Sequence, residues 1–187
     1  SNVLIAGCGT GKQIFIAQNY LNAKIFAVDI SKKSLAYAKR KIEESKIDNV
    51  ELLHADILNL NNLDKKFDLI ECVGVLHHMK DPLKGLKVLL NLLKPHGFMK
   101  LGLYSDIARQ NIERARQLII KKNYKSKFQD IIKFRQEIIK EKKDESLKKI
   151  SRRLDFYSTS GVRDLLFHVQ EHRFTLLQLS EIMFNFN

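Results

Sequence analysis

Three glycines at alternate positions, Gly7, Gly9 and Gly11, form the pattern in this sequence that most restricts its chemistry. They follow an apolar run at residues 3–6, which predicts a buried strand entering a tight turn. Glycine reaches positive φ and has no Cβ, so its backbone can approach a ligand closely, and the following helix offers free N–H groups at its start. The turn therefore predicts a nucleotide-like cofactor at the tip of a first strand, with a turn that binds nothing as the alternative.

The glycine spacing distinguishes between cofactors. A dinucleotide fingerprint needs G-x-G-x-x-G, and Lys12 stands where its third glycine would be. The pattern therefore disfavours NAD.

Two acidic residues follow at the intervals that a nucleoside site requires. Residues 24–28 predict a second buried strand ending in Asp29, whose carboxylate could accept both ribose hydroxyls. The alternative role, a helix cap, fits Ser31 better, because Ser31 precedes a helix with Leu35, Ala38 and Ile42 on one face. Residues 50–54 predict a third strand, and Asp56 in the next loop is either a ligand contact or a solvated acid.

Residues 67–79 predict a fourth strand and turn ending in a tandem histidine. Asp81 and Pro82 then predict a capped helix that ends at residues 94–97 and is followed by a fifth strand at 98–103. The apolar residues expected on the inner face of this helix are Leu83, Leu86, Leu90 and Leu93.

The order of these motifs resembles that of class I methyltransferases dependent on S-adenosylmethionine (SAM), and the resemblance covers residues 3–104. It implies an α/β fold, a doubly wound, mainly parallel Rossmann-like sheet of strand order 3-2-1-4-5, with a helical lid. Only one helical pattern follows residue 175, so we expect strands 6 and 7 of the family fold to be missing. Strand five would then be an edge, covered by the lid, a missing segment or a second copy.

In such a site Asp29 would bind the ribose, Asp56 the adenine amino group, and His77 would line the pocket. The family usually carries an acid two residues before the first glycine, where this chain has Ile5, so its role could shift to the backbone of strand four. The cofactor-binding residues that the resemblance implies are Gly7, Cys8, Gly9, Thr10, Gly11, Asp29, Ile30, Asp56, Ile57, Cys72, Val73 and His77.

Length and composition set further bounds. The 187 residues, 44% of them hydrophobic, suffice for one domain, with a SAM-binding core at 1–104 and a helical lid and C-terminal helices at 105–187. No apolar run is long enough for a membrane span and no leader is visible, so we expect a cytoplasmic protein. Two cysteines without C-x-x-C spacing indicate neither a disulfide framework nor a metal. The sequence begins without methionine just before strand one, which suggests a piece of a longer protein.

Residues 105–155 are charged and helical, with sixteen Lys or Arg against eight Asp or Glu. A basic face attracts nucleic acid, but lysine dominates over arginine, so an RNA substrate is possible and not favoured. We expect a lid here, followed by a solvated, mobile link at 140–149. The helices of this lid would pack through two stripes of residues at helical spacing: Ile107, Ala108, Ala115, Leu118 and Ile119, then Phe128, Ile131, Ile132, Arg135, Ile138 and Ile139.

The segment 156–175 resembles part of bacterial methyltransferase modules that are often attached to tetratricopeptide repeats. It contains H-x-x-E-H at His168, Glu171 and His172, a zinc pattern if helical, which we disfavour because no third ligand follows. The structural alternative to a functional role is a helix capped by Ser160 with a polar face. The candidates for a catalytic base or donor are His77, His78, Tyr157 and His168. Thr175 and Gln178 predict a capping box for a last helix with Leu179, Ile182, Met183 and Phe186 inward.

Methyl transfer needs mainly in-line placement, so the lack of an obvious catalytic residue is no objection. We therefore expect a SAM-dependent methyltransferase acting on a small or peptide-sized acceptor, with no membrane partner. A non-catalytic SAM-binding or interaction module of a repeat protein, and an RNA methyltransferase, remain the alternatives. A homodimer or an intramolecular partner could cover strand five.

Overall fold

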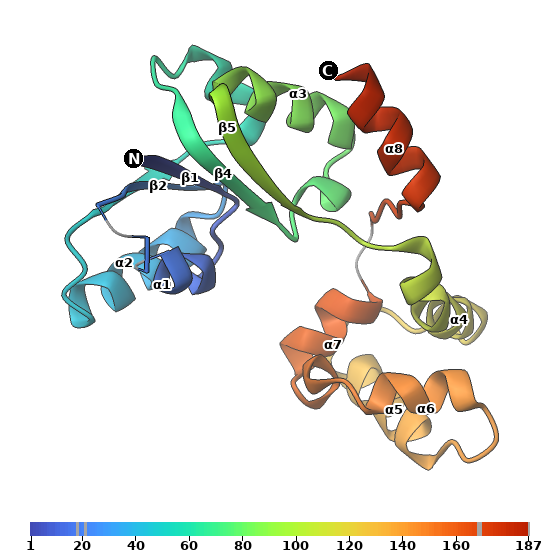
Figure 1. The fold of residues 1–187 in the computed structure, drawn as a ribbon. Helices are drawn as coiled ribbons and strands as arrows, with labels where there is room; N and C mark the ends of the chain where they lie inside the picture. Colours follow the sequence, from blue (N-terminus) through green and yellow to red (C-terminus); the bar gives the residue numbers. More distant parts are fainter. Residues whose placement is uncertain (18, 21, 168–169, 187) are drawn as a thin grey trace. The chain divides into compact units, whose positions relative to one another are not determined.

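The computed structural model of the chain describes residues 1–17, 19–20, 22–167 and 170–186. They form two compact units (Figure 1). Unit 1 comprises Ser1–Leu103 and the residues from Phe184 onward, and unit 2 comprises Tyr104–Met183.

Unit 1 is built on a parallel sheet in which, among the described residues, the strands follow the order β3-β2-β1-β4-β5. The predicted fold class and strand order are thereby confirmed. β5 lies at an edge, as expected, and no other strand of the described residues pairs with its outer side. The strands are β1 (Asn2–Ala6), β2 (Lys24–Asp29), β3 (Val50–His54), β4 (Phe67–Val73) and β5 (Leu93–Gly102).

Helices cover both faces of this sheet, with α1 and α2 on one face and α3 on the other (Figure 1). Apolar side chains of α1 and α2, such as Ile14 and Leu35, pack on Val3, Ile5 and Ile25 of the sheet and form one core cluster. The helical elements are α1 (Lys12–Ala17), α2 (Lys32–Glu44), the short 3₁₀ helices η1 (Ile57–Asn62) and η2 (Leu76–His78), and α3 (Pro82–Leu92).

The predicted caps of α2 and α3 are confirmed, because Ser31 accepts a hydrogen bond from the Ser34 N–H and Asp81 accepts one from the Lys84 N–H. The predicted inner face of α3 was wrong in part. Leu83 is 43% exposed, and Leu90 and Leu93 are half-buried. The stripe that turns inward runs through Pro82, Leu86, Leu89 and Leu92, since the helix begins at the proline and repeats every three to four residues from there.

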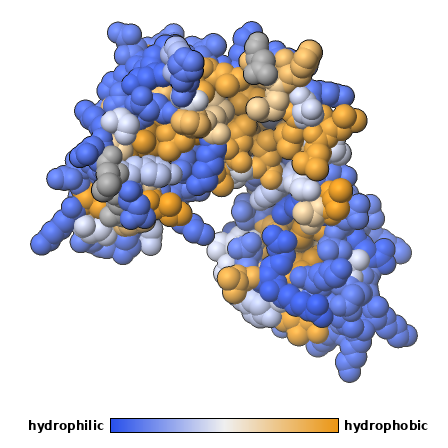
Figure 2. All heavy atoms as spheres, viewed as in Figure 1, coloured by the Kyte–Doolittle hydropathy of each residue, from blue (hydrophilic) through white to orange (hydrophobic). Residues whose placement is uncertain are grey.

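β5 begins earlier than the sequence predicted. Residues 94–97, expected to end the helix, lie within the strand as a bulge, because Leu93 pairs with Phe67 while Phe98 pairs with Leu69. His96 takes a positive φ of 61° there. Phe98, on the same strand, is 76% exposed. Figure 2 shows hydrophobic residues gathered over β4 and β5.

Unit 2 is helical and has its own core, built around Phe134 and Phe156. The isoleucine stripes of α4 and α5 and the apolar residues of α6 and α7 meet in this core. The elements are α4 (Asp106–Lys121), α5 (Phe128–Lys140), α6 (Glu145–Ser151), η3 (Leu154–Tyr157), α7 (Thr159–Leu166) and α8 (Leu176–Asn185), the last crossing into the residues assigned to unit 1.

Several predicted core positions of unit 2 are exposed instead. Ile107 is 76%, Phe128 60% and Ile139 57% exposed, whereas Ile112 and Phe134 are buried. The predicted stripes were right at Ala115, Ile119, Ile131 and Ile138 and wrong at their exposed members. The inward residues are Arg109, Ile112, Ala115 and Ile119 on α4, and Ile131, Phe134 and Ile138 on α5.

The predicted mobile link at 140–149 was wrong in its second half. α6 begins at Glu145, because Asp144 accepts hydrogen bonds from the Ser146 and Leu147 N–H groups. Leu147 and Ile150 then join the core of unit 2. Two apolar residues three positions apart were enough to bury one face of a strongly charged segment.

Near the C-terminus, the cap of α7 is Ser158 and not Ser160, since the Ser158 Oγ accepts the Gly161 N–H at 2.9 Å. The capping box of Thr175 and Gln178 is confirmed by reciprocal hydrogen bonds. The inward face predicted for α8 was wrong in part, because Met183 is 62% exposed and no residue of the helix is fully buried. Among the described residues, no helix is long and apolar enough to cross a membrane.

Candidate functional site

The loop of residues 7–11, called the glycine loop below, leaves β1 with all three glycines at positive φ: +80° at Gly7, +52° at Gly9 and +99° at Gly11. Residues other than glycine rarely adopt positive φ angles, so the three glycines determine the path of the loop. A Cβ on Gly7 would lie 2.3 Å from the Val75 side chain, whereas a Cβ on Gly9 would meet no atom within 4 Å. Gly7 thus serves packing, and Gly9 faces open space.

Asp29, at the end of β2, holds the glycine loop. Its Oδ2 accepts the Gly9 N–H at 2.7 Å, and its Oδ1 accepts the Ser31 N–H at 2.8 Å. The carbonyl of Val28 accepts the N–H groups of Gly7 and Cys8 at 2.8 and 2.9 Å. The carboxylate predicted to bind ribose therefore lies directly against the loop predicted to approach the cofactor.

The end of β3 and the loop that follows it are hydrogen-bonded to the end of β2. The Ala55 N–H donates to the Asp29 carbonyl at 3.2 Å, and the His54 Nε2 donates to the Ile30 carbonyl at 2.9 Å. Asp56 caps η1 by accepting the Leu58 N–H on Oδ1. The apolar side chain of Ile30, which follows Asp29 in the sequence, is 67% exposed.

The loop after β4 also lies at the carboxyl ends of the strands. Cys72 is buried in the strand, Val73 is half-buried, and Gly74 follows at a φ of +79°, where an added Cβ would meet no atom within 4 Å. The Gly74 N–H donates to the Gly102 carbonyl of β5 at 3.0 Å. Gly9 and Gly74 therefore offer open backbone at the ends of two neighbouring strands.

Gly74 and His54 are residues of the candidate site that the sequence analysis did not single out, and it also passed over the buried Glu71. Gly74 lies in the predicted turn after strand four, and its glycine was a readable signal. His54 stands at the end of the predicted third strand. Glu71 was read as part of a buried strand, and a charged residue inside such a run was the signal that could have identified it.

The tandem histidine lies in η2, in the segment after β4. His77 is fully buried, and its ring lies edge-on to that of His78 with 4.3 Å between the ring centroids. The other base candidates belong to unit 2 or lie outside the described residues. Tyr157 is 63% exposed at the end of η3, and His168 falls outside the described residues.

The zinc pattern includes His168, which lies outside the described residues. α7 ends at Leu166, and Glu171 forms ion pairs with Arg109 and with Arg116, at 3.1 Å in the second case. A glutamate held by two guanidinium groups is engaged as a structural anion rather than as a base beside a metal. Among the described residues there is no cluster of three or more His, Cys, Asp or Glu side chains that could hold a metal.

The two cysteines are expected to be unreactive in the folded protein. Burial raises the pKa of Cys8 to about 12, with the charge of Asp29 adding to the effect, and burial raises the pKa of Cys72 to about 12. Because the thiolate is the reactive form, both thiols should resist a disulfide reagent at pH 8 and react fully once the chain is unfolded. Rapid labelling of the native protein would contradict this.

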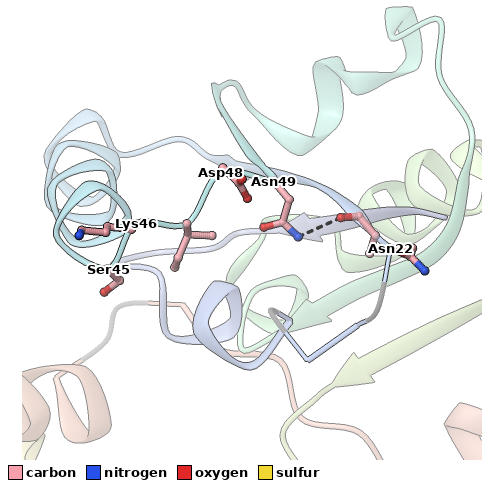
Figure 3. A pocket seen from close by; sticks show the side chains of 7 residues that line it. Asn22, Ser45, Lys46, Asp48 and Asn49 are labelled. Atoms are coloured by element: carbon pink, nitrogen blue, oxygen red, sulfur yellow. Dashed lines mark hydrogen bonds between the residues drawn. The ribbon is translucent and has the colours of Figure 1, made fainter.

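A pocket of about 330 Å³ lies elsewhere on unit 1 (Figure 3). Its lining comes from the residues that precede β2 and β3, including Asn22, Asp48 and Asn49, and the Asn49 side-chain amide donates to the Ala23 carbonyl at 2.9 Å. It is therefore at the amino ends of the strands, whereas the glycine loop and both acids are at the carboxyl ends. In open parallel sheets ligands bind at the carboxyl ends, so this pocket is not part of the site.

Comparisons with known proteins agree with this geometry. Residues 1–105 match the family model described as a methyltransferase domain. The structure of PKMT2 from Rickettsia typhi covers 99% of this chain and 38% of its own, with a TM-score of 0.76 and 25% sequence identity. A second structure of that protein, in complex with AdoHcy, has a TM-score of 0.75 over the same shares.

Two curated relatives match about three fifths of the chain. An uncharacterised protein of Synechococcus is 36% identical over 119 residues, which are 63% of this chain and 28% of that protein. Demethylmenaquinone methyltransferase of Clavibacter sepedonicus is 31% identical over 118 residues, 63% of this chain and 46% of that enzyme. The chain thus spans less than half of the length of either relative. It belongs to the methyltransferase domain family, with the class I fold whose cofactor is SAM.

Proposed function

We propose that this chain binds SAM at the carboxyl ends of β1, β2, β3 and β4 and takes part in methyl transfer to a small or peptide-sized acceptor. The observation that carries the proposal is the pairing of Asp29 with the Gly9 N–H, which joins a carboxylate to an open glycine backbone. The AdoHcy complex of the Rickettsia typhi protein supports it, because that fold covers nearly the whole chain.

In this proposal the chain's own residues hold and orient the nucleoside. Asp29 accepts the ribose hydroxyls, Asp56 accepts the adenine amino group on its Oδ2, and the exposed Ile30 and the buried Ile57 give the adenine ring apolar contact. Gly9 and Gly74 leave room for the cofactor's aminoacyl part, since neither has a neighbour that a Cβ would meet. The backbones of Cys8 and Thr10, with Gly7 and Gly11, complete the loop, and Cys72, Val73 and His77 lie on the β4 side.

SAM supplies a methyl group already activated on a sulfonium, so the chain's task is placement and exclusion of water. We assign that task to unit 2, as a lid that selects the acceptor. Its support is its position in the sequence, directly after β5, and its independent helical core. His77 and His78, Tyr157 and His168 remain candidates for taking a proton from the acceptor.

The longer relatives also bear on the context of the chain. We propose that it is one part of a larger bacterial protein of the kind that carries tetratricopeptide repeats, on the resemblance of residues 156–175 to such modules.

An RNA acceptor is the second candidate, because ten of the sixteen basic residues at 105–155 form no ion pair with the residues that the structure describes. Steep loss of RNA binding between low and high salt would favour it.

Turnover with methyl-labelled SAM tests the proposal. The chain should transfer label to a component of a metabolite or peptide pool and release S-adenosylhomocysteine (SAH), and Asp29→Ala should not. A protein that binds SAH but transfers no label to any pool would be the non-catalytic module.

The site should need neither a thiol nor a metal. We expect SAH affinity to be unchanged by Cys8→Ser. We also expect it to be unchanged by incubation with EDTA, because no group of three or more His, Cys, Asp or Glu side chains among the described residues could hold a metal ion. Loss of binding with EDTA that zinc restores would return His168 and His172 to consideration as ligands.

A further inference from the structure

Glu71 is a buried charge in the middle of the sheet. It lies on β4, is 1% exposed, and pairs in register with Ile5 on β1 and with Lys100 on β5. Taking a carboxylate out of water is costly unless partners compensate for the lost solvation. An apolar residue would fill this strand position at lower cost, so the presence of glutamate calls for a reason.

The partners of Glu71 come from two other elements. The Tyr20 hydroxyl donates to the Glu71 Oε1 at 2.5 Å, and the Lys100 Nζ donates to the same oxygen at 3.3 Å. The hydrogen bond from Tyr20 is also the main reason that the pKa of Tyr20 is raised. Lys100 is 56% exposed, so its ion pair is partly screened, and the bond to Tyr20 is the stronger tie.

Tyr20 connects Glu71 to the glycine loop through α1. The Tyr20 N–H donates to the Ala17 carbonyl at the last residue of the helix. At the other end of α1, the Ile14 N–H donates to the Gly11 carbonyl at 3.0 Å. α1 has only six residues, so a tie at its end fixes the whole helix and, with it, the downstream end of the glycine loop.

We propose that Glu71 is a positioning residue for the cofactor, which holds α1 and the glycine loop through Tyr20 and takes the place of the acid that β1 lacks at Ile5. The inference rests on the proposed SAM site. It adds a side chain to the role that the sequence analysis gave to the backbone of strand four, because a carboxylate lies one strand away from Ile5. Parallel neighbours are about 4.8 Å apart, so a side chain on either strand reaches the same space.

The test is a transplant of the acid between strands in the full 187-residue chain. Glu71→Leu should weaken SAH binding about tenfold by calorimetry, the loss of one charge-assisted hydrogen bond. Ile5→Glu combined with Glu71→Leu should restore affinity to within about threefold, while the neutral control, Ile5→Gln with Glu71→Leu, should not. A role in stability alone would lower the melting temperature without changing affinity well below it.

Hydrogen exchange gives a readout that needs no cofactor. In Glu71→Leu, and in Tyr20→Phe should the first variant not fold, the amides of α1 should exchange about tenfold faster while those of α2 stay unchanged. Unchanged α1 exchange with unchanged SAH affinity, or rescue by glutamine as good as by glutamate, would overturn the proposal. Failure of the unaltered chain to bind SAH would instead bring down the proposed function, and this inference with it.

Discussion

Gly7→Ala is expected to unfold or severely destabilise unit 1, whereas Gly9→Ala should leave it folded and abolish cofactor binding. At Gly7 an added Cβ would come within 2.3 Å of the Val75 side chain, at a φ of +80° that alanine rarely adopts. Backbone strain and overpacking together should cost about 3 kcal/mol or more. At Gly9 the φ is +52° and the space is open, so the cost to folding should be about 1 kcal/mol.

The two variants separate packing from ligand space. The free energy of unfolding by urea measures the first effect, and a calorimetric titration with SAH measures the second. Equal stability of the two variants would contradict the assignment of Gly7 to packing. Full SAH affinity in Gly9→Ala would mean that the open space above Gly9 is not the cofactor's.

Asp29→Ala and Asp56→Ala should each weaken SAH binding by about 1.5 to 3 kcal/mol, which is about 10- to 150-fold. Each substitution removes a polar contact proposed for the nucleoside. Asp29→Ala should have the larger effect, because it also releases the N–H groups of Gly9 and Ser31 that the carboxylate holds. The measurement is the dissociation constant by calorimetry, at a temperature where each variant is folded.

A matched control keeps this result specific. Asp48 is an exposed acid in the pocket at the opposite ends of the strands, so Asp48→Ala removes the same charge away from the site (Figure 3). Its SAH affinity should equal that of the unaltered chain. Equal losses in all three variants would reflect net charge, and unchanged affinity in both Asp29→Ala and Asp56→Ala would remove the basis for the nucleoside site.

β1, β2 and β4 could be predicted because they are short, largely apolar runs that end in Asp or are followed by Gly, and each signal is local. β5 was harder. Residues 94–97 read as a helix stop, since Pro and Gly cluster there, yet the bulge that they form depends on pairing with β4. The same limit applies to Glu71, whose partners Tyr20 and Lys100 are far from it in sequence.

In unit 2 the helices were readable, but their buried faces were not. Arg109 is only 4% exposed. Its guanidinium donates a hydrogen bond to Glu171, 62 residues later, and its Cζ lies 3.8 Å from the centroid of the Tyr104 ring. A sequence pattern that treats arginine as a surface residue leaves Arg109 out of the buried face of α4, although Ala115 and Ile119 of that face were predicted.

The most direct test of the SAM site is a calorimetric titration of the 187-residue chain with SAH. We predict one saturable site per chain that Asp29→Ala weakens about tenfold or more and Asp48→Ala leaves intact. A chain that is folded by circular dichroism and shows no saturable SAH binding would contradict this prediction.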